Sequence, residues 1–270
     1  MIKDITFGQY FETKSKIHKL DPRIKILLLL VLLVFIFLCK NFVSMGFLTA
    51  FILICALITK IPFKVYLKNI KVILPVVIFT ALINLFYSGG EGDVLLHWWK
   101  LTITTDGISR ALFMAIRIVI LIFTSSILTY TTTPNDLTDA IERLLSPLKF
   151  IGLGNAVHTV AMMMTIALRF IPTLVEETDK IMSAQKARGA DLENGKLIER
   201  IKALIPILIP LLISSVRRAY ELAEAMECRC YNGGSGRTRM KQLKLHIGDL
   251  ISSMIMVSVC IAVLLINKLF

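Results

Sequence analysis

Long runs of apolar residues constrain the fold of this chain more than any other feature. Five stretches consist mostly of apolar residues, and they cover residues 24–39, 42–59, 72–87, 107–130 and 247–269. A helix needs roughly 20 mostly apolar residues to cross the hydrocarbon core of a bilayer. The sequence therefore predicts an all-α membrane protein with about five transmembrane helices.

Composition supports the same class. Hydrophobic residues make up 56% of the chain and charged residues 19%, and the mean hydropathy is +0.73. A soluble domain has about a quarter of its residues charged. Residues 1–23 are mixed polar and lack the pattern of a secretory signal, so we expect the first membrane segment to stay attached.

The net charge of +12 is distributed unevenly, and its distribution predicts topology. Lys and Arg gather in residues 1–23, between the second and third apolar stretches, and above all in residues 131–246. The other side of the membrane has only Lys40, Lys100 and the terminal Lys268. Basic loops stay in the cytoplasm. We therefore expect a cytoplasmic N-terminus, a cytoplasmic segment 131–246 and an outside C-terminus, with no nucleic acid partner.

This pattern divides the chain into three parts. Residues 1–130 form a four-span transmembrane part, residues 131–246 a large cytoplasmic region, and residues 247–270 a last transmembrane helix. The middle region predicts a short amphipathic helix and two long helices, at about 155–188 and 197–230, each apolar first and polar later. Because Pro172, Pro206 and Pro210 interrupt the apolar halves, we do not count either as a full span, and whether they enter the membrane stays open.

Two acidic residues on the first long helix match two basic residues on the second. Glu176 and Glu177 precede Arg217 and Arg218 by 41 positions. If the helices cross near their middles, these four side chains can form ion pairs between them. The alternative is that all four are solvated surface charges, which contribute little to stability.

Both long helices end on an arginine between two small residues. The first ends at Ala187, Arg188 and Gly189, and the second at Cys228, Arg229 and Cys230. A cation and a glycine are ordinary features of a helix C-terminus. A guanidinium at the end of a rigid helix is also a good docking group for a partner. The C-x-C pair has no further Cys or His at metal-ligand spacing, so we predict no metal site.

Several motifs together resemble one known family. The segments SKIHKLDPRIKIL (15–27), TTTPNDLTDAIERLLSPLKFIGL (131–153) and AQKARGAD (184–191) are similar to signatures of the transmembrane T component of energy-coupling factor (ECF) transporters, the EcfT/CbiQ-like family. The second arginine motif departs from the family pattern, because Cys228 and Cys230 replace Ala and Gly. Since Cys230 lacks the freedom of glycine, we expect Gly233 or Gly234 to form the turn there.

The resemblance implies a function and a set of partners. In such transporters cytoplasmic coupling helices, here the three predicted in residues 131–246, connect two ABC-type ATPase subunits, identical or different, to a substrate-binding membrane S component. The motif residues 187–189 and 228–230 would dock the ATPases. The family implies a bacterial or archaeal cell membrane and uptake of a vitamin or transition metal. The chain itself would be no enzyme and would bind no cofactor, because ATP and Mg belong to the ATPases.

Other functions agree less well with the residues. The chain has no Gly-rich phosphate loop, and its four histidines are scattered without forming an acid–base or metal constellation. The remaining alternative is a secondary transporter or channel subunit without ATPase partners. Such proteins place acidic residues inside the membrane, whereas here Asp249 lies only near a span end.

Overall fold

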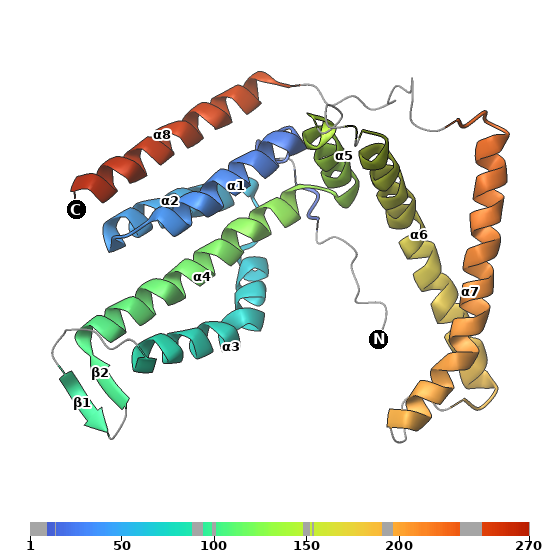
Figure 1. The fold of residues 1–270 in the computed structure, drawn as a ribbon, viewed down its shortest axis with the longest axis horizontal. Coiled ribbons are helices and arrows are strands. Elements are labelled where there is room, and N and C mark those ends of the chain that lie inside the picture. Colours follow the sequence, from blue (N-terminus) through green and yellow to red (C-terminus); the bar gives the residue numbers. More distant parts are fainter. Residues whose placement is uncertain are drawn as a thin grey trace. The chain divides into compact units, whose positions relative to one another are not determined.

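The computed structural model describes residues 10–13, 15–87, 94–98, 101–147, 152, 154–190, 197–232 and 245–269. Their regular secondary structure is helical apart from one short β-hairpin (Figure 1). They divide into two compact units, which are described separately. The first contains the described residues within 8–133 and 242–270, and the second those within 134–241.

The first unit is a bundle of five helices that run alternately up and down. Its elements are α1 (Pro22–Leu38), α2 (Phe42–Thr59), α3 (Phe63–Tyr87), α4 (Thr105–Thr131) and α8 (Ile247–Leu269). At one end, the backbone N–H of Asp21 before α1 donates to the carboxylate of Asp249 in α8. At the other end, Asn267 Nδ2 donates to the carbonyl oxygen of Leu38, 3.0 Å away. Helices α1 and α8 are therefore parallel.

Hydrogen bonds also show which ends of the other helices lie on the same side of this unit. Lys25, in the first turn of α1, donates to the carbonyl oxygen of Thr131, the last residue of α4. Thr13, shortly before α1, donates to the carbonyl oxygen of Thr59, the last residue of α2. Helices α1, α3 and α8 thus begin, and α2 and α4 end, on one side of the unit. We call this side the basic face, because Lys16, Lys19, Lys60 and Lys64 lie there.

Local sequence explains where α1 begins. Asp21 has an extended backbone and its Oδ1 accepts a hydrogen bond from the N–H of Arg23, 2.9 Å away. Pro22 occupies the first helical position, where its missing N–H leaves no hydrogen bond unmade. Asp-Pro therefore fixes the point at which the chain enters the bundle.

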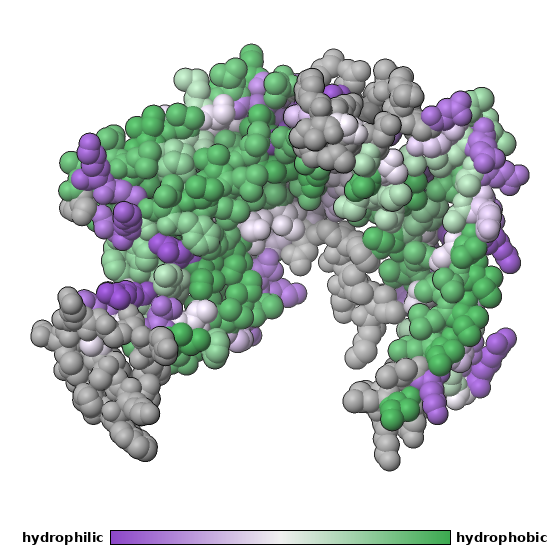
Figure 2. All heavy atoms as spheres, viewed as in Figure 1, coloured by the Kyte–Doolittle hydropathy of each residue, from purple (hydrophilic) through white to green (hydrophobic). Residues whose placement is uncertain are grey.

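The bundle buries a small core and exposes a large apolar surface. Ile36, Leu48, Tyr66 and Tyr130 are among its fully buried side chains, and Tyr66 stacks on the ring of Phe123. Outward-facing apolar side chains remain exposed on every helix of the unit, and Figure 2 shows them covering much of the visible surface. Exposed apolar surface of this extent suits hydrocarbon and not water.

Two features of this unit differ from the sequence-based expectations. Helix α3 begins at Phe63 and not near residue 72, because the lysines that interrupt its apolar pattern lie on a continuous helix. The connection expected to be a plain loop between the third and fourth spans contains an antiparallel pair, β1 (Val94–Trp98) and β2 (Leu101–Thr104). Its strands are too short to show a clear period-two pattern.

The second unit contains α5 (Pro134–Leu144), α6 (Gly154–Ala187) and α7 (Leu197–Glu227), with α5 packed on α6 and α6 on α7. Figure 1 shows α6 and α7 running in opposite directions, with the later part of α6 crossing α7. Both helices continue through their prolines, so Pro172 does not interrupt α6. Figure 1 also shows α7 changing direction in its first half, where Pro206 and Pro210 lie.

Among the described helices, five are long and apolar enough to cross a membrane: α2, α3, α4, α8 and residues 156–187 of α6. This set differs from the expected one at two places. The 17-residue α1 is slightly shorter than the other spans, whereas α6, which the sequence analysis did not count, qualifies by length and composition. Length and composition make α6 a candidate span because the helix continues through Pro172, and whether it enters the membrane stays a prediction.

Candidate functional site

The C-terminal end of α6 forms a tight hydrogen-bonded cap around Arg188. The N–H of Ala190 donates to the carbonyl oxygen of Gln185 at 3.0 Å, and the N–H of Gly189 donates to that of Lys186 at 3.0 Å. Gly189 has a φ of 89°, in the left-handed region. This combination is a Schellman motif, and Arg188 is the last residue before the left-handed one.

The C-terminal end of α7 repeats the same arrangement around Arg229. The N–H of Tyr231 donates to the carbonyl oxygen of Met226 at 3.1 Å, and the N–H of Cys230 to that of Glu227 at 2.8 Å. Cys230 has a φ of 56° and takes the place that Gly189 has in α6. The two arginines therefore occupy equivalent positions in two equivalent caps, which we call the α6 tip (187–189) and the α7 tip (228–230).

The expectation that Gly233 or Gly234 forms the turn at the α7 tip was wrong. Both glycines lie outside the described residues, but Cys230 already adopts the left-handed conformation. A side chain in this conformation costs about 1–2 kcal/mol. Two backbone hydrogen bonds to the last turn of α7 offset this cost, so the cap forms without glycine.

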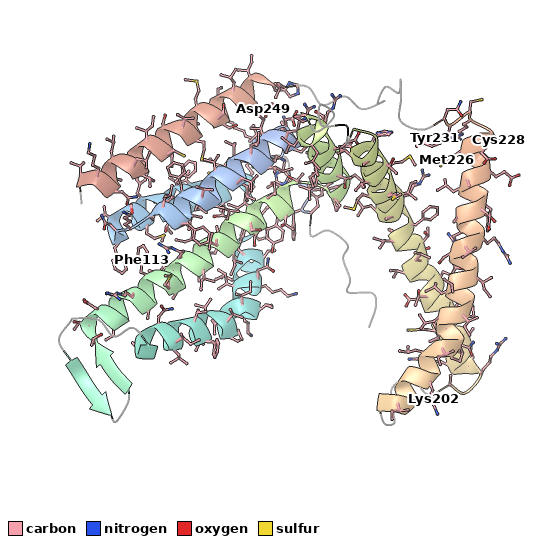
Figure 3. The ribbon with its side chains drawn as sticks, viewed as in Figure 1. Phe113, Lys202, Met226, Cys228, Tyr231 and Asp249 are labelled. Atoms are coloured by element: carbon pink, nitrogen blue, oxygen red, sulfur yellow. The ribbon has the colours of Figure 1, made fainter. Side chains whose placement is uncertain are left out.

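Both tips are exposed, and they lie at opposite ends of the α6–α7 pair. Arg188 and Arg229 are exposed, as are Ala187, Cys228 and Cys230. Gln185, beside the α6 tip, donates to the carbonyl oxygen of Pro206 near the start of α7. From Pro206 to Arg229 the helix is roughly 35 Å long, at 1.5 Å per residue. Figure 3 shows Cys228 and Tyr231 at one end of α7 and Lys202 at the other.

The middle of the pair contains one of the anticipated ion pairs. Arg218 Nη2 lies 2.7 Å from Glu177 Oε2, and Ser214 donates to the other oxygen of Glu177. Glu176 and Arg217 are exposed and form no ion pair with another described residue. The structure thus brings together Glu177 and Arg218 but not Glu176 and Arg217.

Sequence reasoning missed a buried polar cluster at the basic face of the first unit. Lys25, only 7% exposed, donates to the carbonyl oxygens of His18 at 3.2 Å and Thr131 at 2.9 Å. Asp249, only 2% exposed, accepts from the backbone N–H groups of Asp21 and His246, each at 2.8 Å. These contacts tie the start of α1 to the end of α4 and the start of α8. The only sequence signal was a charged residue just inside each of two apolar spans.

A polar contact also joins two helices of the second unit. His158 Nδ1 of α6 lies 3.2 Å from Glu142 Oε1 of α5. In the described part of the chain, no group of three His, Cys, Asp or Glu side chains is placed to hold a metal ion. Cys228 and Cys230 are free thiols at the surface.

Comparison with known proteins assigns the chain to a family. Residues 13–241 match the CbiQ family, described as cobalt transport protein. The energy-coupling factor transporter transmembrane protein EcfT of Clostridium kluyveri is 54% identical over 265 residues, which cover 98% of this chain and 97% of that protein. The EcfT of Ruminiclostridium cellulolyticum is 52% identical over 270 residues, all of both chains. The chain belongs to the EcfT family.

Family membership accounts for the general character of the molecule. An EcfT protein is a transmembrane component of an ECF transporter, and this chain has the apolar helices of a multi-pass membrane protein. The match extends through both units, because it includes the bundle helices α1–α4 and the segment that carries both tips. The resemblance inferred from the sequence motifs is confirmed.

Proposed function

We propose that this chain is the energy-coupling subunit of an ATP-driven ECF importer. Two ABC-type ATPase subunits, identical or different, dock on the α6 tip and the α7 tip from the cytoplasm. Their closure on ATP moves α6 and α7, and this movement reorients a membrane S component that carries a vitamin or a transition metal ion. The chain itself is not an enzyme, and ATP and Mg are bound by the ATPases.

The equivalence of the two tips is the observation that carries this proposal. Arg188 and Arg229 project from the same position of the same capping motif, at opposite ends of one helix pair. The last carbonyl oxygens of a helix need hydrogen-bond donors, and at both tips backbone N–H groups supply them. Capping of the helices therefore does not explain why an exposed arginine stands at each tip. Two ATPase subunits related by approximate symmetry present two equivalent grooves. Each guanidinium can donate in a fork to a carboxylate and carbonyls in such a groove.

The bundle supports a location of both tips on one side of the membrane. Helix α4 ends and α8 begins at the basic face, so the segment between them must cross the membrane an even number of times. Helix α6 therefore does not cross alone, although its length and composition would allow it. Helix α7 is not among the described helices that qualify as spans. This favours the placement of both helices at the cytoplasmic side, where the basic loops also lie.

The exposed apolar surface of α6 and α7 supports the S-component part of the proposal. Met163 and Met164 of α6 are 60% and 48% exposed, and Leu208 and Leu212 of α7 are 58% and 66% exposed. A large exposed apolar patch marks a site of protein or membrane contact. Methionine suits surfaces that repack against a moving partner.

Co-purification from cells tests the proposal. The double variant Arg188→Glu/Arg229→Glu should lose both ATPases and ATP-driven uptake, because a carboxylate replaces each docking cation. The control Arg217→Glu reverses an exposed charge on α7 away from the tips and should retain both. If the double variant keeps its ATPases and normal uptake, the docking role is wrong. If the wild type co-purifies with no ATPase, a transporter or channel subunit without ATPases is the better account.

A further inference from the structure

A cavity lies between helices of the first unit at the basic face. Its volume is about 690 Å³, within the range of small-molecule sites in proteins. Its walls come from α1, α2, α4 and α8 and include Leu28, Leu32, Ile52, Ile127 and Met256. Lining residues of α1 extend from Lys25 to Leu32, which is about 11 Å of helix. The cavity therefore reaches inward from the membrane boundary by about two helical turns.

The cavity opens sideways between α2 and α8. Ile54 and Ile58 on α2 and Ile251 and Ile255 on α8 belong to its lining, and each is between 42% and 55% exposed. On a membrane-spanning bundle, exposed side chains at this depth contact lipid. The phase that adjoins the opening is thus hydrocarbon, and a chain from it can enter without passing through water.

The polar groups deep in the cavity are already occupied by the protein. Thr124 and Thr131 donate to carbonyl oxygens of their own helix, and Ser252 donates to that of Asp249. Lys25 holds two carbonyl oxygens, and each oxygen of Asp249 accepts a backbone N–H. These five side chains offer a polar ligand no free partner, whereas an acyl chain needs none.

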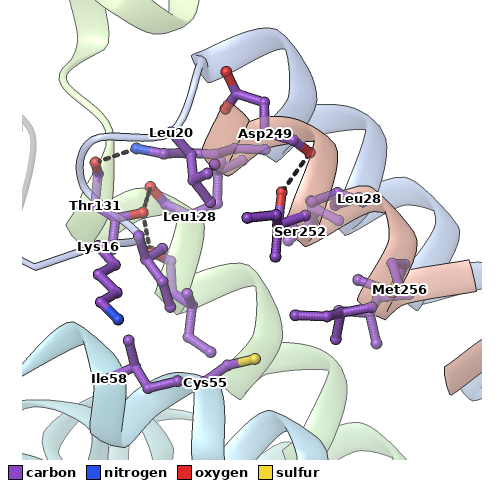
Figure 4. Close-up of a pocket in the computed structure, with 18 of the residues that line it drawn as sticks. Lys16, Leu20, Leu28, Cys55, Ile58, Leu128, Thr131, Asp249, Ser252 and Met256 are labelled. Atoms are coloured by element: carbon purple, nitrogen blue, oxygen red, sulfur yellow. Dashed lines mark hydrogen bonds between the residues drawn. The ribbon is translucent and has the colours of Figure 1, made fainter. Parts of the chain in front are cut away.

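Positive charge is concentrated at the mouth. Lys16 and Lys19 line the cavity, are exposed, and form no ion pair with a described carboxylate. Figure 4 shows the ammonium group of Lys16 directed toward Ile58, across the cavity from Ser252 and Met256. Two ammonium groups at the end of an apolar slot are complementary to an anionic headgroup attached to an acyl chain. Basic pockets between helices on the cytoplasmic side bind such lipids.

From this arrangement we propose that the cavity is a binding site for an anionic phospholipid of the cytoplasmic leaflet. One acyl chain fills the space between α2 and α8, and the phosphate lies between Lys16 and Lys19. The lipid thereby packs against the polar cluster that ties α1, α4 and α8 together. The proposal rests on membrane embedding with the basic face toward the cytoplasm, and not on docking of the ATPases.

Native mass spectrometry of the full chain in detergent tests the site. Phosphatidylglycerol should remain bound more strongly than phosphatidylcholine with the same acyl chains. The variant Lys16→Gln/Lys19→Gln should weaken phosphatidylglycerol binding by roughly fivefold for each lysine lost. The matched control Lys64→Gln/Lys68→Gln removes two exposed lysines near the same face that do not line the cavity, and it should bind like the wild type.

Two further measurements examine the apolar part of the site. Cys55→Phe places a larger side chain in the cavity wall without changing charge, and it should weaken phosphatidylglycerol binding. Glycerol phosphate, which has the headgroup charge but no acyl chain, should not displace the lipid. Equal retention of the two lipids, an equal loss in the Lys64/Lys68 control, unchanged binding in Cys55→Phe, or displacement by glycerol phosphate would each overturn the proposal.

Discussion

Cys230 adopts a left-handed backbone conformation although it is not glycine. It occupies a left-handed position that Gly189 takes at the other tip, and both caps have the same hydrogen bonds. Sequence reasoning recognised the substitution but placed the turn at later glycines, because it treated side-chain preference as decisive. The hydrogen bonds to the carbonyl oxygens of the last turn outweigh the steric cost of the left-handed conformation. The cap therefore keeps its geometry but is less stable than one with glycine.

Substitution of Cys230 by glycine should therefore stabilise the protein. Glycine removes the steric cost of the left-handed conformation, so we expect a gain of about 1 kcal/mol in the free energy of unfolding. Thermal unfolding of the purified protein in detergent measures the change. Cys228→Gly is the matched control, since Cys228 lies outside the left-handed region and glycine there should give no gain. A lower stability for Cys230→Gly than for the wild type would contradict the cap described here.

His18 is held neutral by its surroundings. Burial lowers the pKa of its imidazole below the ordinary value of 6.5, and the nearby charge of Lys25 lowers the pKa further, although a hydrogen bond to Phe11 opposes both. Nε2 lies 3.0 Å from the carbonyl oxygen of Phe11, so it carries the proton. Nδ1 then accepts from the Ser15 hydroxyl, 2.7 Å away.

The lowered pKa of His18 predicts a loss of stability in mild acid. The unfolded chain takes up a proton near pH 6.5, whereas the folded chain does so only at lower pH. The free energy of unfolding should therefore be unaffected by His18 above pH 6.5 and should fall as the pH drops from 6.5 toward the folded-state pKa. Thermal unfolding at several pH values measures this slope. His18→Gln should reduce it, whereas the exposed His246→Gln should not, and equal slopes in all three proteins would be inconsistent with a neutral His18.

At the scale of elements, an ion pair between Glu177 and Arg218 joins α6 and α7 where the two helices cross. Glu177 accepts from Arg218 and Ser214, while Glu176 and Arg217 are exposed to solvent. The 41-residue spacing identified the right region but could not say which of the adjacent residues faces the other helix. Rotation of each helix about its axis decides that, and it depends on apolar packing that spacing does not encode.

A double-mutant cycle tests this contact. Arg218→Glu alone should destabilise the protein through repulsion with Glu177, and Glu177→Arg/Arg218→Glu should recover part of the loss. Because both side chains are partly exposed, we expect a coupling of less than about 1 kcal/mol. The same exchange at Glu176 and Arg217 is the control and should show no coupling. Thermal unfolding of the set gives the value, and a zero coupling for Glu177 and Arg218 would refute the contact.

The sequence predicted the presence of the helices better than their boundaries, their connections and the contacts between them. The apolar runs located α2 and α8 closely, since composition alone distinguishes a span. They missed the first turns of α3, where lysines interrupt the pattern, and they missed the β1–β2 hairpin. The cluster around Lys25 and Asp249 was also unpredicted, because it joins residues more than a hundred positions apart.

At the scale of the whole molecule, energy coupling requires both tips to lie at the cytoplasmic side of the membrane. Parallel α1 and α8 and the common basic face fix the number of crossings in the bundle, and the lysine and arginine distribution then selects the orientation. If the orientation holds, both arginine tips are available to ATPases in the cytoplasm. Without it, neither the docking nor the movement of α6 and α7 has a physical basis.

Labelling of the native thiols at the α7 tip shows most directly on which side of the membrane this tip lies. Cys228 and Cys230 are exposed, and a membrane-impermeant maleimide should label them in inside-out vesicles but not in intact cells, in the chain expressed without ATPases. A variant with both replaced by Ala should lose the signal, and an added Thr105→Cys, on the side opposite the basic face, should label in intact cells. Labelling of Cys228 and Cys230 in intact cells, or in neither preparation, would contradict the account.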